Sequence, residues 1–211
     1  MRSDRRSLTR RAVLGGLAAG AAASDLASRA IAGRTMGLAV ADPGLDHAIL
    51  NRALAALARH GDAVWSRDVI GVVDFSQPSA VPRFHIADIL SGTTRTILVA
   101  HGKGSDPDHS GMLQSFSNVE GSEATSEGAY LIGDPYSGIH GASRRLIGLD
   151  PSNDTAMARA IVIHSAAYVG EDVIARQGKL GRSDGCFAVS AQDIGYVLAK
   201  LGTGRLLFAS R

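Results

Sequence analysis

Between residues 69 and 210 the chain is built from short segments rich in β-branched and other aliphatic residues, each bounded by Gly, Pro, Ser or Asp. Such segments are typical of β-strands that are joined by turns. We expect strands over 69–75, 83–89, 94–102, 127–133, 144–150, 159–169, 186–190 and 204–210. A long polar stretch rich in Gly and Ser, 102–128, interrupts the series and is typical of a binding loop. The pattern predicts a mainly β domain with a few helices.

Two other segments carry helical signals. Residues 45–61 place apolar side chains at helical spacing, and Gly61 follows as a stop signal. We expect this amphipathic helix to pack on the sheet. Ser190 and Asp193 form a capping-box pattern at the start of a second helix, and Gly202 is expected to cap its C-terminal end.

The first 32 residues differ in charge from the rest of the chain. They carry six arginines and two acidic residues, whereas the remainder has 16 basic and 18 acidic residues. A basic surface for nucleic acid would therefore rest on this segment alone, and no nucleic-acid partner is expected. The division predicts a separate N-terminal segment, 1–32, and one domain over 33–211.

The N-terminal segment has the parts of an export signal. A charged start is followed by "AVLGGLAAGAAA", and "AIAG" offers a cleavage site after Ala32. "TRRAVL" resembles a twin-arginine signal, which predicts export to the periplasm or the outside. The apolar run is short and rich in Gly and Ala, so no stable membrane span is expected. The alternative is a basic arm before an Ala-rich helix.

Cys186, in "GRSDGCFAV", is the single cysteine of the chain. An internal disulfide framework and a zinc site built from several cysteines are therefore excluded. The thiol can be a packed side chain, an intermolecular disulfide partner or a nucleophile. A nucleophilic thiol needs a neighbouring base, and His164 at the end of a strong apolar strand segment is the candidate. Gly185 would allow a substrate to approach closely, and N–H groups near Gly185 and Cys186 could face an oxyanion.

Four segments, taken in order, support the hypothesis that Cys186 is a nucleophile and His164 its base. They are "SNVEGSEATSEGAY", "GIHGASRRLIGLD", "IVIHSAAYV" and "GRSDGCFAV". The last two resemble the catalytic signature of the YkuD-type L,D-transpeptidases, and the set resembles the murein L,D-transpeptidase catalytic domain family over roughly 70–190. The resemblance implies an L,D-transpeptidase-like β-sandwich with a cleft at one end. It also implies that peptidoglycan stem peptides are substrates and that carbapenems acylate the same thiol.

The resemblance also assigns roles to individual residues. Cys186 corresponds to the acylated nucleophile, His164 to the base, and Ser165 to the residue whose carbonyl accepts the Nδ1 proton of that base. Gly185 corresponds to the glycine before the nucleophile. The position before this glycine holds Asp184 instead of the usual histidine, and we expect Asp184 to point outward or to pair with an arginine, Arg182.

The expected substrate contacts lie on loops around this pair: His101, His140, Arg182 and Ser183. No metal ion and no organic cofactor are required by this chemistry. An arginine near the thiol could hold a substrate carboxylate through two hydrogen bonds.

Three alternatives remain open from the sequence. The same fold could pass the acyl group to water, as an L,D-carboxypeptidase. His101 and Asp108 are spaced as in one group of zinc-dependent cell-wall peptidases, but no downstream His-x-His pair supplies further ligands. A non-catalytic wall-binding module could keep the fold and lose the chemistry.

Overall fold

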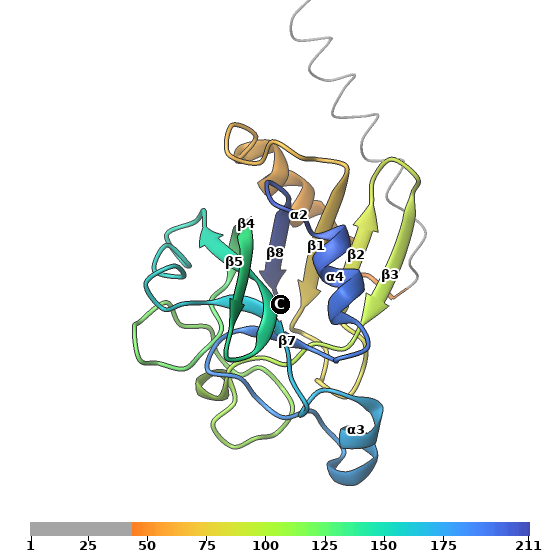
Figure 1. Ribbon diagram of the computed structural model, residues 1–211, viewed down its shortest axis with the longest axis vertical. Helices are drawn as coiled ribbons and strands as arrows, with labels where there is room; N and C mark the ends of the chain where they lie inside the picture. The colour runs from red at the N-terminus through yellow and green to blue at the C-terminus, as the bar shows by residue number, and fades with distance from the viewer. Residues whose placement is uncertain (1–43) are drawn as a thin grey trace, which may run out of the picture. The chain divides into compact units, whose positions relative to one another are not determined.

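The computed structural model describes residues 44–211 (Figure 1). The expected export signal in 1–32 and its cleavage site lie outside the described residues. Within 44–211 no helix has the length and apolar character needed to cross a bilayer.

Eight strands form one hydrogen-bonded sheet, in the order β3-β2-β1-β8-β4-β5-β6-β7. The strands are β1 Val69–Asp74, β2 Phe84–Asp88, β3 Thr93–Ile97, β4 Gly128–Gly138, β5 Gly141–Gly148, β6 Val162–Ser165, β7 Phe187–Val189 and β8 Leu206–Ser210. Neighbouring strands are antiparallel except for the parallel pairs β1–β8 and β6–β7. Every expected strand segment overlaps an observed strand, so the mainly β prediction is confirmed.

The sheet nearly closes on itself. The backbone N–H of Ala100, just after β3, donates to the carbonyl of Ala188 on β7 at 2.9 Å. These two segments stand at opposite ends of the strand order, so the sheet must curl round for them to meet. Phe84 from β2 and Phe187 from β7 lie in the same buried cluster for this reason. The result is a curled, sandwich-like β architecture, as the family resemblance implied.

Two helices cover parts of this sheet. Helix α2, His47–Arg59, is capped by the Asp46 carboxylate, which accepts from the Ala48 N–H at 2.6 Å. Its buried face packs with apolar side chains of β1, β4 and β8. Helix α4, Ile194–Lys200, has Asp193 as its N-cap, without a side-chain hydrogen bond to the helix. The expected bond between Ser190 and Asp193 is present one turn earlier, where the Ser190 hydroxyl accepts from the Asp193 N–H at 3.1 Å. The C-terminal cap is Leu201 rather than the expected Gly202.

Strand β6 and the connection from β6 to β7 both differ from what the sequence predicted. The segment 159–169 was expected to be one long strand, but only Val162–Ser165 joins the sheet. Ala160 interrupts it, because its φ of 53° is incompatible with an extended strand. A short helix that the sequence did not predict, α3, Glu171–Gln177, then carries the chain across to β7. A crossover of this kind is what a parallel strand pair requires.

Candidate active site

The parallel pair β6–β7 brings the two candidate residues to neighbouring strands. His164 on β6 pairs with Ala188 on β7, and Cys186 directly precedes β7. Paired residues of a sheet share a face, and so do residues two apart on one strand. The intervening residue Phe187 and the neighbouring Ile163 both point into the main core. His164 and Cys186 therefore share the opposite face of this pair.

His164 has a defined tautomer. Its ring is 1% exposed, and Nδ1 lies 2.9 Å from the carbonyl oxygen of Ser165. A carbonyl only accepts, so Nδ1 carries the proton and Nε2 keeps its lone pair. Burial lowers the pKa of His164, the Ser165 carbonyl opposes this, His140 lowers it further and Asp184 raises it. The ring is thus held neutral at pH 7, with one nitrogen able to accept a proton.

Cys186 is half-buried, and its thiol has a single hydrogen-bond acceptor among residues 44–211. Sγ lies 3.8 Å from the carbonyl oxygen of Ala160. Burial raises the pKa of the thiol, a backbone hydrogen bond from Val162 lowers it, Asp184 raises it, and Arg159 lowers it. The resting group is therefore a thiol, and a base must remove its proton when it reacts.

The turn that carries Cys186 is held by its own hydrogen bonds. The Ser183 hydroxyl donates to the Cys186 carbonyl at 2.6 Å and accepts from the Gly185 N–H at 3.2 Å. Ser183 is 4% exposed, so it braces this turn, and a substrate contact is not favoured. The Gly185 N–H is occupied by Ser183, which argues against the oxyanion role expected for it.

Gly185 is required at its position for two reasons. Its φ is 111°, a conformation that residues with a Cβ rarely adopt. A Cβ at this position would also lie 2.7 Å from the Ala124 carbonyl oxygen and 3.1 Å from an Arg159 nitrogen. The expected close approach of backbone at Gly185 is present, and the approaching group is the loop 102–128.

Asp184 points outward, as expected, with a side chain that is 74% exposed. Its partner is Lys103 at 3.0 Å rather than the expected Arg182. Arg182 instead donates to the backbone carbonyls of Asp106 and Pro107. Lys103 therefore offsets Asp184, the carboxylate that raises the pKa of the thiol, and Arg182 holds the neighbouring loop.

His101 does not line a cleft. Its ring is 1% exposed and lies between the buried side chains of Arg83 and Asp106. The Arg83 guanidinium donates to Nδ1 at 2.8 Å, so the proton is on Nε2, which faces Asp106 at 3.3 Å. Burial and the Arg83 charge lower the pKa of His101 to about 4, although Asp106 opposes the shift. This placement argues against the substrate contact expected for His101.

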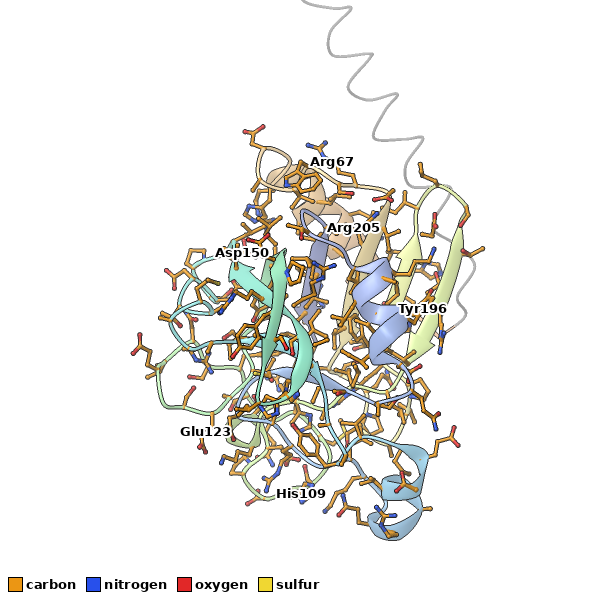
Figure 2. All side chains as sticks on the ribbon, viewed as in Figure 1. Arg67, His109, Glu123, Asp150, Tyr196 and Arg205 are labelled. Atoms are coloured by element: carbon orange, nitrogen blue, oxygen red, sulfur yellow. The ribbon has the colours of Figure 1, made fainter. Side chains whose placement is uncertain are left out.

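The loop 102–128 is largely free of helix and strand, but it is firmly held. A single turn of 3-10 helix, η1 Lys103–Ser105, is its one regular element. The Asp106 carboxylate accepts from the N–H groups of Ser110 and Gly111, at 2.7 and 2.8 Å. Figure 2 shows His109 and Glu123 of this loop at the end of the domain that carries α3, away from Arg67 and Arg205. Since Glu123 and Asp184 both pair with Lys103 at 3.0 Å, the turn that carries Cys186 lies at the same end.

Two further features bear on possible ligands. A cavity of about 650 Å³ opens between β3, the β6–α3 connection and the β7–α4 connection, and its lining includes Arg95, Gly170 and Gln192. Neither Cys186 nor His164 lines it. In the described part of the chain no three His, Cys, Asp or Glu side chains gather in a way that could hold a metal ion.

Residues 41–210 match the L,D-transpeptidase catalytic domain family of YkuD-type proteins. The chain belongs to this family. No curated protein matches it.

Solved structures similar to this L,D-transpeptidase domain are distant in sequence. One is an L,D-transpeptidase from Mycobacterium smegmatis, with 14% identity, a TM-score of 0.43, and coverage of 68% of this chain and 59% of that one. An L,D-transpeptidase from Mycobacterium tuberculosis H37Rv has 14% identity, a TM-score of 0.44, and coverage of 68% and 58%. L,D-transpeptidase 3 from Mycobacterium tuberculosis, with a faropenem-derived adduct, has 13% identity, a TM-score of 0.44, and coverage of 68% and 60%. The chain thus spans about three fifths of the length of each.

Within this L,D-transpeptidase domain, sequence reasoning did not predict the contacts that Arg159 and Lys103 make around the thiol. Arg159 donates to the carbonyls of Ser117 and Ala124, and to the Ser126 hydroxyl at 2.6 Å. Lys103 neutralises Asp184. Neither residue lies in a local pattern that signals a role, because their partners are far away along the chain.

Proposed function

We propose that this protein is an exported cysteine acyltransferase that acts on peptidoglycan stem peptides, with Cys186 as nucleophile. The observation that carries the proposal is the β6–β7 pair. It holds His164, with its Nδ1 proton fixed by the Ser165 carbonyl, on the same face as Cys186. A thiol beside a neutral imidazole with a free lone pair is the arrangement that nucleophilic thiol catalysis needs.

In the proposed acylation, His164 Nε2 accepts the proton of the Cys186 thiol as Sγ attacks the carbonyl carbon before the terminal D-residue. The C–N bond to that residue then breaks. The leaving nitrogen takes the proton back from Nε2, and a thioester remains on Sγ. Because burial raises the pKa of the thiol, the resting group is the thiol, and His164 has to accept its proton for Sγ to attack.

In the proposed second half of the reaction, an acceptor attacks the thioester carbon. His164 Nε2 takes a proton from the acceptor and returns it to the departing sulfur. An amine of a second stem peptide gives a cross-link, which is transpeptidation. Water gives a free shortened peptide, which is carboxypeptidation. The choice depends on which acceptor reaches the thioester carbon.

Acyl transfer is tested by incubating the purified protein with tetrapeptide muropeptides and measuring the product masses by mass spectrometry. We expect a 3–3 cross-linked dimer and loss of one D-alanine per dimer, from the donor stem. A free tripeptide would assign the carboxypeptidase activity instead. C186A should abolish turnover, and H164A should slow acylation by about 10² or more, as expected for loss of a positioned base. No D-alanine release by the folded protein would favour the wall-binding module.

The acyl-enzyme is tested with a carbapenem, whose strained lactam presents a similar carbonyl. One solved L,D-transpeptidase is described in complex with imipenem. We expect one mass adduct on this protein, on the peptide that contains Cys186 and absent from C186A. Adduct formation at full rate in C186A would refute the assignment of the nucleophile.

Export forms a separate part of the proposal. "TRRAVL" and "AIAG" lead us to expect a mature N-terminus near Gly33 in exported material. Replacing Arg10 and Arg11 by Lys should retain the precursor inside the cell. Normal export of this double variant would contradict the twin-arginine assignment.

A further inference from the structure

A second histidine lies against the ring of His164. His140 stands in the turn between β4 and β5, and its ring stacks on His164 with centroids 4.1 Å apart and planes inclined by 22°. His140 is exposed, whereas His164 is 1% exposed. The turn therefore covers one ring face of the proposed base and presents its own imidazole to solvent.

The stack completes the positioning of His164. The Nδ1–H bond to the Ser165 carbonyl fixes one edge of the ring at 2.9 Å, but a single hydrogen bond allows the ring plane to tilt. A flat ring pressed against one face restricts that tilt. The Ser165 carbonyl holds one edge of the His164 ring, and the His140 ring holds one face. The Nε2 lone pair therefore keeps a fixed direction, which proton transfer requires.

The stack also affects the charge on His164. Two imidazoles at this separation repel each other when both are protonated, so a charge on either ring disfavours a charge on the other. Consistent with this, His140 acts to lower the pKa of His164.

Other charged and titratable groups around His164 come from three segments. Asp184 and Cys186 lie on the nucleophile turn, Tyr168 follows β6, and Lys103 pairs with Asp184 at 3.0 Å. Among residues 44–211, Asp184 is the carboxylate that favours a charged His164, and Lys103 offsets it. On balance the surroundings favour the neutral ring, and His140 adds to this from the solvent side.

We propose that His140 is a positioning residue that holds the plane of His164 and keeps it in its neutral, proton-accepting form. The proposal deepens the proposed function, since it takes His164 as the base. It also gives His140 a role other than the substrate contact expected from the sequence.

The test follows the His164 ring by NMR as a function of pH in a C186A background, where no turnover occurs. H140F keeps a flat ring but cannot be charged, and H140A removes the ring. We expect the titration midpoint of His164 to rise in both variants, by at least about half a pH unit. H47A, which changes an exposed histidine at the start of α2, is the matched control and should leave the midpoint unchanged.

Kinetics in the Cys186-containing protein give the second readout. We expect the acid limb of the kcat/KM profile to move to higher pH in H140F and H140A, with a lower plateau in H140A alone. An unchanged His164 midpoint in both variants overturns the proposal, and so does a higher KM without a shift of the midpoint. Because the NMR measurement needs no activity, an inactive enzyme with the expected midpoint shift would refute the proposed function and leave this inference intact.

Discussion

At the scale of single residues, the thiol of Cys186 lies between opposing influences. Burial and Asp184 raise its pKa, whereas Arg159 and a backbone hydrogen bond lower it. Lys103 is the only described cation that pairs with Asp184. Beyond burial, the pKa of the thiol therefore responds to Asp184, whose charge is offset by a lysine far away along the chain.

D184N should lower the pKa of the thiol, because a carboxylate that disfavours the thiolate is removed. K103M should raise it, because Asp184 then loses its counter-charge. The measurement is the pH dependence of Cys186 alkylation, and the two shifts should shrink as salt is added. D172N, which removes an exposed carboxylate paired with Arg176 on α3, is the control and should have little effect. Shifts of equal sign in D184N and K103M would contradict the argument.

Gly185→Ala should impair both folding and activity. The φ of 111° and the 2.7 Å approach to the Ala124 carbonyl oxygen leave no room for a methyl group. We expect a loss of roughly 1–3 kcal/mol in unfolding free energy, measured by urea titration. We also expect loss of turnover, because the turn that carries Cys186 must move. Gly121→Ala is a useful comparison, because a Cβ there, at φ 75°, meets no atom within 4 Å.

Local patterns in the sequence predicted the candidate pair but not its surroundings. Cys186 and His164 could be singled out because a thiol and a strand-end imidazole carry recognisable chemistry. The chain Arg83–His101–Asp106 could not, because nothing local indicates that these side chains meet in the interior. The ion pair between Lys103 and Asp184 was also not predictable, because the residues next to each partner do not indicate that the two side chains meet.

At the scale of elements, the strands were predictable because short runs of β-branched and other aliphatic residues reflect burial, and β1, β7 and β8 are buried at every position. Helix α3 was missed because it has seven residues and only Val173 is fully buried, so its periodicity is weak. The strand expected over 159–169 was too long, since an apolar run does not reveal that Ala160 turns the chain out of the ladder. The formation of short helices and the exact ends of strands therefore depend on tertiary contacts.

The loop 102–128 should depend on one arginine. Arg159 binds Ser117, Ala124 and Ser126, so R159M leaves those groups without their donor. We expect faster amide hydrogen exchange in 115–126 and a higher pKa of Cys186, while exchange in α2 stays unchanged. Unaltered protection of the loop would show that its remaining hydrogen bonds suffice. R176M on α3 is the matched control.

At the scale of the whole molecule, the buried histidine links stability to pH. The pKa of His101 is lowered from 6.5 to about 4 by burial and Arg83. Between these values the unfolded chain binds the proton more readily than the native one, so stability is full above about 6.5 and is lost as the pH falls towards 4. The loss is on the order of 3 kcal/mol. Denaturant titrations at several pH values should show this slope, and H101N should flatten it. An equal slope in H101N would assign the loss to other groups.

The central place of β8 has a consequence for biosynthesis. β8 is the last strand along the chain, yet it lies between β1 and β4 (Figure 1). Until residue 210 has emerged from the ribosome, one edge of β1 and one edge of β4 have unpaired backbone groups, which can pair with other chains and cause aggregation. The domain can therefore complete its sheet only after translation has passed its final strand.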